Sequence, residues 1–154
     1  MAVVSPRRCR KTLIGPRDLQ NHALSLEQVR QRIETIEESY EFFLAYAAQG
    51  LTREGASRSG GEVRRFLERT EEALTGLADA MASVVDSEGL EPPEPYRDMI
   101  DVLRRDADAT RAAVRLVLAQ DGISSQLIDN LNASIHVRAL LTDLFLLDEV
   151  LGGV

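Results

Sequence analysis

Carboxylate side chains gather on two helix-like segments of this sequence, and carboxylates on facing helices are the ligands of a di-metal centre. The positions are Glu34, Glu37, Glu38 and Glu41 in one segment and Glu68, Glu71 and Glu72 in the next. A di-iron bundle also needs Glu-x-x-His motifs on two helices. The chain has two histidines, and Leu19 and Ala133 stand three residues before them, so neither motif exists. We therefore expect no metal site, and we expect these carboxylates to lie on solvated helix faces.

Two other side chains could act as nucleophiles. His136 could accept a phosphoryl group, as in histidine phosphotransfer modules, which are also helical bundles. Those modules usually place a small Gly-type residue just downstream, whereas here Val137, Arg138 and Ala139 follow. Cys9 lies within a run of cations that favours its thiolate, but no second cysteine or nearby histidine completes a catalytic unit. The sequence therefore predicts no catalytic residue and no cofactor.

The cations around Cys9 belong to a basic N-terminal segment on an otherwise acidic chain. Residues 1–24 carry five basic side chains and one acidic side chain, whereas the whole chain has a net charge of −7. An acidic body argues against nucleic-acid binding. Four of the cations are close enough in sequence to form one docking patch: Arg7, Arg8, Arg10 and Lys11. We expect this patch to bind an acidic protein partner.

Four long helices are predicted to carry these side chains. The first begins at Ser25, which forms a capping box with Gln28, and ends at Gly50. Its apolar residues recur at spacings of three and four, which is the heptad rhythm of helices that pack nearly parallel. They are Leu26, Val29, Ile33, Ile36, Tyr40, Phe43 and Ala47.

The same rhythm continues after loops that are rich in glycine or proline. A second helix is predicted over residues 59–85, in which Gly76 is a mild interior cost of about 1 kcal/mol. A third helix is predicted over residues 95–121. A fourth begins with Ser124 as its N-cap, after a tight turn that makes the last two helices an antiparallel pair.

The predicted architecture is all-α: an up-down-up-down four-helix bundle of residues 25–154 that follows a flexible basic arm of residues 1–24. At 154 residues, the chain has the size of one domain with a sizeable core. Its one cysteine excludes an intrachain disulfide, and no stretch approaches the roughly 20 apolar residues of a membrane span. The N-terminus has no apolar signal core, so we expect a cytoplasmic protein.

The last part of the fourth helix is apolar on more than one side. From Val137 to Leu151, 10 of 15 residues are apolar, whereas one bundle seam needs roughly three positions in seven. We expect a two-fold dimer whose contact shares these residues with the core. The positions predicted to face the second chain are Val137, Leu140, Leu144, Leu147 and Leu151.

These observations favour a non-enzymatic interaction or assembly protein that self-associates and docks a partner through its basic arm. The alternative is a ligand- or metal-binding bundle of a degenerate ferritin-like type, with its site among the carboxylates and Tyr40, Tyr46 or Tyr96. A solution mass above that of one chain would favour assembly. Metal bound to the purified protein would favour the alternative.

Overall fold

The computed structural model describes residues 16–53 and 61–152, and all of the regular structure in these two ranges is helical. Six helices follow one another: α1 (Pro16–Ala48), α2 (Val63–Leu74), α3 (Leu77–Glu88), α4 (Glu94–Leu118), α5 (Ser125–Ala133) and α6 (Ile135–Leu151). The predicted all-α class is therefore confirmed for this part of the chain. Within it, every helix is too short or too polar to span a membrane.

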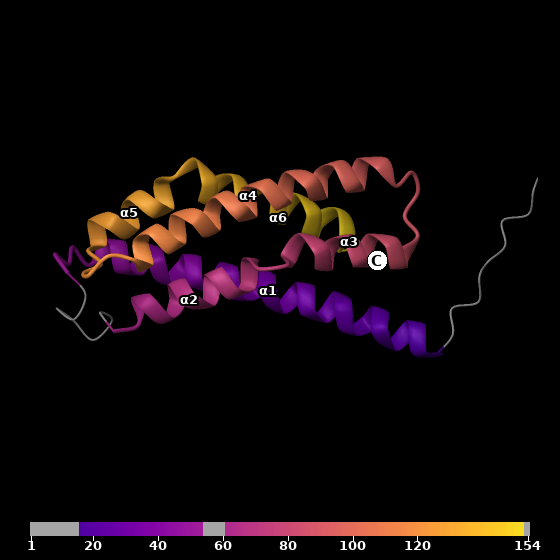
Figure 1. Cartoon of the computed structure of the whole chain (residues 1–154), viewed down its shortest axis with the longest axis horizontal. Coiled ribbons are helices and arrows are strands. Elements are labelled where there is room, and N and C mark those ends of the chain that lie inside the picture. Colours follow the sequence, from indigo (N-terminus) through magenta and orange to yellow (C-terminus); the bar gives the residue numbers. More distant parts are fainter. Residues whose placement is uncertain (1–15, 54–60, 153–154) are drawn as a thin grey trace, which may run out of the picture.

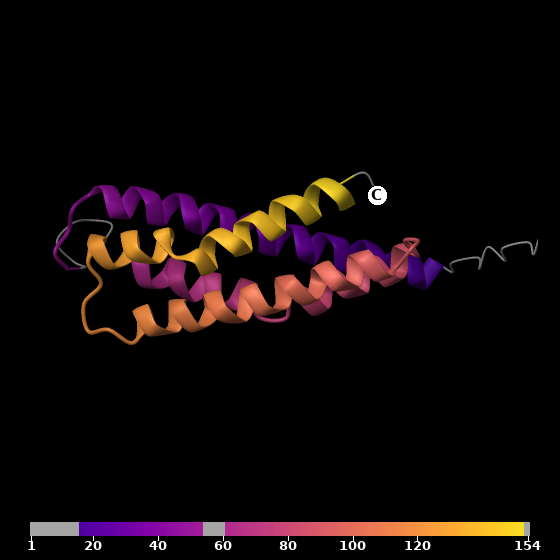
Figure 2. The same cartoon turned by 90° about the horizontal axis from the view of Figure 1, so that it is seen from above.

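The helices run along one long axis, with α3 continuing from the end of α2 and α6 from the end of α5 (Figure 1). From α1 the chain returns through α2 and α3 in succession, reverses again into α4, and returns once more through α5 and α6 (Figures 1 and 2). α1 packs against α2, α3 and α5, whereas α4 packs against α2, α3, α5 and α6. The core is therefore enclosed by α1, by α4, by the successive helices α2 and α3, and by the successive helices α5 and α6.

The inward positions of the predicted heptads form this core. Burying a large aliphatic side chain stabilises a fold by about 1.5–3 kcal/mol, so these positions dominate the stability of the chain. They include Val29, Ile33, Ile36 and Phe43 of α1, Val63, Leu67, Leu74, Leu77, Met81 and Val84 of α2 and α3, and Ile100, Leu103, Ala107, Val114 and Val117 of α4.

The second predicted helix is divided in two at Thr75 and Gly76. Thr75 is extended and Gly76 is left-handed, with φ of 73°. Glycine adopts this conformation without the steric cost that other residues meet. Arg32 of α1 stabilises the break, because its guanidinium donates hydrogen bonds to the carbonyls of Ala73, at 3.2 Å, and Thr75 at the end of α2. The expectation that Gly76 lies inside a continuous helix was wrong.

The fourth predicted helix is also divided, at Ser134. Ser124 caps the first half as predicted, because its Oγ accepts a hydrogen bond from the backbone N–H of Leu127 at 3.1 Å. Ser134 is extended and repeats this arrangement, accepting from the backbone N–H of Val137 at 3.3 Å. A second side-chain cap therefore starts a new helix where the sequence pattern predicted continuity.

Helix α1 begins at Pro16, well before the predicted start at Ser25. Proline suits the first turn of a helix because its missing N–H would have no helical partner there. The basic positions Arg7, Arg8, Arg10 and Lys11 lie outside the described residues, as does Cys9. The division into an arm of residues 1–24 and a bundle of residues 25–154 stays a prediction.

Candidate functional site

Helix α6 has one face that its own chain covers completely. The five positions predicted to contact a second chain all lie on this face and are buried in the core of the single chain, the most exposed being Val137 at 8%. They are Val137, Leu140, Leu144, Leu147 and Leu151. This is a correction of the predicted contact set, because these side chains already fill the space beside α4, against which α6 packs.

The opposite face of α6 exposes a different set of apolar side chains. In the described part of the chain, six large hydrophobic side chains are exposed, and four of them belong to this one helix. They are Ile135 at 75%, Phe145 at 57%, Leu146 at 52% and Val150 at 50%. The other two, Leu44 on α1 and Leu116 on α4, lie on other helices. Exposed apolar residues concentrated on one element are typical of an association surface.

The break at Ser134 explains why the sequence pattern selected the wrong face. The predicted face was obtained by extending a helical wheel from Leu131 and Ile135 through one continuous helix. Ser134 is extended, with φ of −61° and ψ of 142°, so α6 does not keep the helical phase of α5. Leu131 is buried as predicted, whereas Ile135 is exposed. A serine that can cap a helix was the available signal for this change of phase.

Two opposite charges lie on the same outer face of α6. Arg138 and Glu149 are both exposed, and they are eleven residues apart, which is three helical turns. Within the described residues, neither side chain forms an ion pair. Thr142 lies on this face between them, and its hydroxyl donates to the Arg138 carbonyl at 2.9 Å. The outer face therefore carries an apolar region with one free charge of each sign.

A pair of acids lies between α6 and α4. The Asp143 side chain is 6% exposed, and its Oδ2 atom has no hydrogen-bond partner. Burial, a hydrogen bond with Asp106 and the negative charge of Asp106 together raise the pKa of Asp143 to about 7. On the next turn of α4, Thr110 donates to the carbonyl of His136 at 3.1 Å. This pair could not be predicted from the sequence, because Asp106 and Asp143 belong to no common motif and are far apart along the chain.

The carboxylates that suggested a metal site are engaged elsewhere or exposed. Glu38 pairs with Arg69 at 3.1 Å, and Glu71 accepts one hydrogen bond from Arg115 on α4. Partial burial, together with the neighbouring Asp148, Glu41 and Glu34, raises the pKa of Glu37. In residues 16–53 and 61–152, no group of three or more histidine, cysteine, aspartate or glutamate side chains is placed to hold a metal ion.

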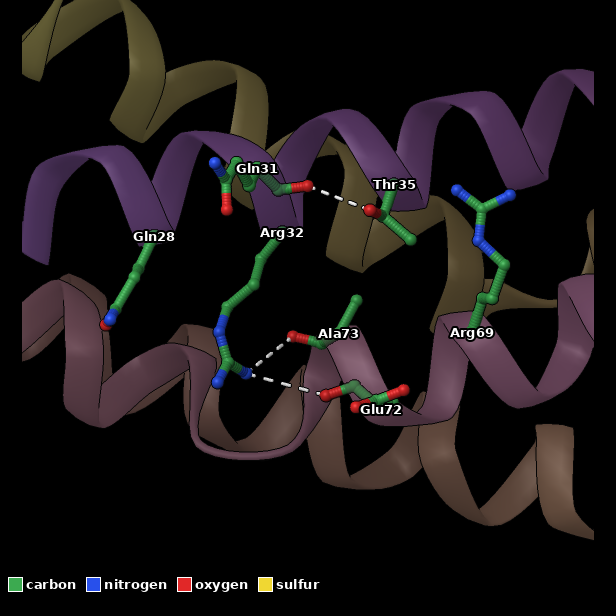
Figure 3. Close-up of a pocket in the computed structure, with 7 residues that line it drawn as sticks. All are labelled: Gln28, Gln31, Arg32, Thr35, Arg69, Glu72 and Ala73. Carbon is green, nitrogen blue, oxygen red and sulfur yellow. Dashed lines mark hydrogen bonds between the residues drawn. The ribbon is translucent and has the colours of Figure 1, made fainter. Parts of the chain in front are cut away.

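A polar cavity of about 440 Å³ lies between α1 and the C-terminal half of α2 (Figure 3). Its two guanidinium groups do not converge on the space. Arg32 reaches down to the end of α2 (Figure 3). Arg69 pairs with Glu38, and its guanidinium carbon lies 5.3 Å from the centre of the Phe66 ring. The remaining lining residues are Gln28, Gln31, Thr35, Glu72 and Ala73. These arginines therefore hold helices together, and the cavity offers no concentrated charge to a ligand.

The other residues considered for chemistry do not come together. The Tyr46 side chain is buried, and its hydroxyl donates to the Ile123 carbonyl at 2.7 Å, so it joins α1 to the start of α5. Tyr40 and Tyr96 are half-buried against the core, and the His136 side chain is exposed. No protein-family model matches this chain, and comparison with curated proteins and with solved structures gave no significant match.

Proposed function

We propose that this protein is a non-enzymatic assembly protein, an up-down-up-down four-helix bundle that forms a homodimer through the outer face of α6. The single observation that supports this most is the concentration of exposed apolar side chains on α6, which are Ile135, Phe145, Leu146 and Val150. The inner face of the same helix is occupied by the core, so the outer face is free to contact a second copy. A two-fold dimer is the commonest closed assembly that hides such a face.

Light scattering of the full chain over a range of concentrations tests this proposal. We expect a dimer at tens of micromolar, and we expect Leu146→Glu to give a monomer with unchanged helix content. Leu116→Glu is the matched control, because Leu116 is an exposed leucine on α4, at 67%. That variant should remain a dimer. A strictly monomeric unmodified protein at these concentrations would overturn the proposal.

We further propose that the basic run Arg7, Arg8, Arg10 and Lys11 docks an acidic protein partner, and that the protein acts in the cytoplasm. The support is the contrast between this run and the net charge of −7 of the whole chain. Replacing the four cations by alanine should abolish binding to polyglutamate at low salt and leave the dimer intact. Equal binding by the variant and the unmodified protein would contradict the docking proposal.

Cell fractionation tests the proposed location. Recovery of the protein outside the cytoplasm would contradict it.

A further inference from the structure

The outer face of α6 has a charge pattern that is complementary to itself. Arg138 and Glu149 lie on this face about 16 Å apart along the axis, at 1.5 Å per residue. Thr142, Phe145 and Leu146 occupy the stretch between them. The face therefore has a positive end, a mostly apolar centre and a negative end.

We propose that two copies pack α6 against α6 in antiparallel orientation about a two-fold axis, with Arg138 of each copy against Glu149 of the other. This inference rests on the proposed self-association and adds its orientation and register. The axis then passes between residues 143 and 144, because these lie midway between positions 138 and 149. The same register places Thr142 opposite Phe145 of the second copy, so that the aromatic side chain lies near the centre of the contact.

The parallel arrangement is disfavoured by the same charges. It would place Arg138 against Arg138 and Glu149 against Glu149 of the second copy, and like charges that face one another across an interface are repulsive. The antiparallel arrangement replaces both repulsions by attractions. Neither charge has an ion-pair partner in the described part of the chain, so both are available.

The net charge of the chain also favours a contact face that includes a positive side chain over a face that is only apolar and acidic. Each copy has a net charge of −7, and two such copies repel one another at long range. A region that presents its own positive charge next to the apolar centre reduces this repulsion where the copies meet. An exposed helix face with acids alone around its apolar centre would not have this property.

Sedimentation equilibrium with charge reversals tests the register. Arg138→Glu and Glu149→Arg should each raise the dimer dissociation constant by about tenfold or more, since each creates two like-charge contacts. The double variant restores opposite charges in both contacts and should return to within about threefold of the unmodified protein. Arg65→Glu, at an exposed position of α2, is the matched control and should leave the constant unchanged.

The outcomes separate the two proposals. A dimer whose dissociation constant does not respond to either single reversal would overturn the antiparallel register and leave self-association standing. An unmodified protein that never dimerises would overturn the proposed function itself. Failure of the double variant to recover, with its helix content intact, would also overturn the register.

Cross-linking with a short bismaleimide gives a second measurement in a Cys9→Ser background. A single cysteine introduced by Thr142→Cys lies near the axis and should cross-link the two copies. One introduced by Glu149→Cys should not, because the two positions 149 are about 16 Å apart along the antiparallel helices. Efficient cross-linking at 149 would indicate parallel helices and overturn the inference.

Discussion

The carboxyl group of Asp143 on α6 lies close enough to that of Asp106 on α4 for the two to share a hydrogen bond, and Asp143 is almost entirely buried. Two carboxyl groups can share a hydrogen bond only when one of them holds a proton. Burial also disfavours the ionised form, which is why the pKa of Asp143 rises to about 7 from an ordinary value of 3.8. The contact between α4 and α6 therefore includes a carboxyl group that keeps its proton up to about pH 7.

This relationship predicts that Asp143 makes the fold less stable as pH rises. The folded chain holds the proton up to about pH 7, whereas the unfolded chain loses it near pH 3.8, so the contribution of Asp143 is full below pH 3.8 and is lost as pH rises to about 7. Asp143→Asn keeps the shape of the side chain without an ionisable proton. We expect this variant to be more stable than the unmodified chain by about 2 kcal/mol at pH 8.

Urea unfolding at pH 4, 6 and 8 measures this difference. The difference in the free energy of unfolding between Asp143→Asn and the unmodified chain should be small at pH 4 and should grow up to about pH 7. The other carboxylates are the same in both chains, so their contributions cancel in this difference. Asp129→Asn, at an exposed acid of α5, is the control and should show no such trend. An Asp143→Asn variant that is less stable than the unmodified chain at pH 8 would contradict the shared proton.

Periodicity alone was sufficient to predict the helical class and most of the core. Positions such as Ile33, Leu67 and Leu103 were placed inward by their spacing, and all are buried. Hydrophobic spacing is a strong signal because every turn of a long amphipathic helix repeats it. Helices α1 and α4 each run without a break, as the spacing predicted for the first and third helices.

The breaks could not be predicted from the same spacing. Gly76 and Ser134 each change the helical phase at one residue, whereas the apolar residues on either side still recur at three and four. The break at Gly76 also depends on Arg32, which lies more than forty residues earlier and caps α2 through tertiary contact. The break at Ser134 is the reason why the contact face on α6 was misplaced. The orientation of α6 follows from this break and from the packing of α6 against α4.

The two faces of α6 predict opposite outcomes for the same chemical change. Leu144 is buried and Leu146 is half-exposed. Leu144→Asp should unfold the chain or cost more than about 3 kcal/mol, because it buries an unpaired charge. Leu146→Asp should change the free energy of unfolding of the single chain by less than about 0.5 kcal/mol and should weaken self-association. Circular dichroism with thermal melting measures the first effect, and a folded Leu144→Asp variant of normal stability would contradict the burial of this face.

Replacing the glycine at the break between α2 and α3 should lower the free energy of unfolding. Gly76→Ala should destabilise the chain by about 1 kcal/mol, because alanine disfavours the left-handed conformation that Gly76 adopts. The cost comes from the backbone alone, since an added Cβ would meet no atom within 4 Å. Gly61→Ala is the matched control, because that position also has free space but no positive φ. Chemical denaturation that finds equal effects for the two variants would show that the break tolerates a side chain.

The Ser125 side chain joins the start of α5 to the end of α1 through two hydrogen bonds. The Ser125 side chain is buried, and its Oγ donates to the Tyr46 carbonyl at 2.6 Å and accepts from the backbone N–H of Leu51 at 2.9 Å. The Ser125 backbone N–H also donates to the Leu51 carbonyl at 2.9 Å. One residue of α5 therefore holds both the last turn of α1 and the chain that leaves it.

Ser125→Ala removes the hydroxyl, so the part-buried N–H of Leu51 loses its acceptor, whereas the Tyr46 carbonyl loses one donor and keeps the N–H of Gln49 at 3.2 Å. An unsatisfied buried polar group costs about 1–3 kcal/mol, so we expect a loss of about 2 kcal/mol in the free energy of unfolding. Ser83→Ala is the control, because the Ser83 hydroxyl donates only to the Asp79 carbonyl on an exposed face of α3. That change should alter stability by less than about 0.5 kcal/mol. Hydrogen exchange gives the decisive reading: the amide of Leu51 should lose protection in Ser125→Ala alone, and unchanged protection would show that the hydroxyl does not hold the end of α1.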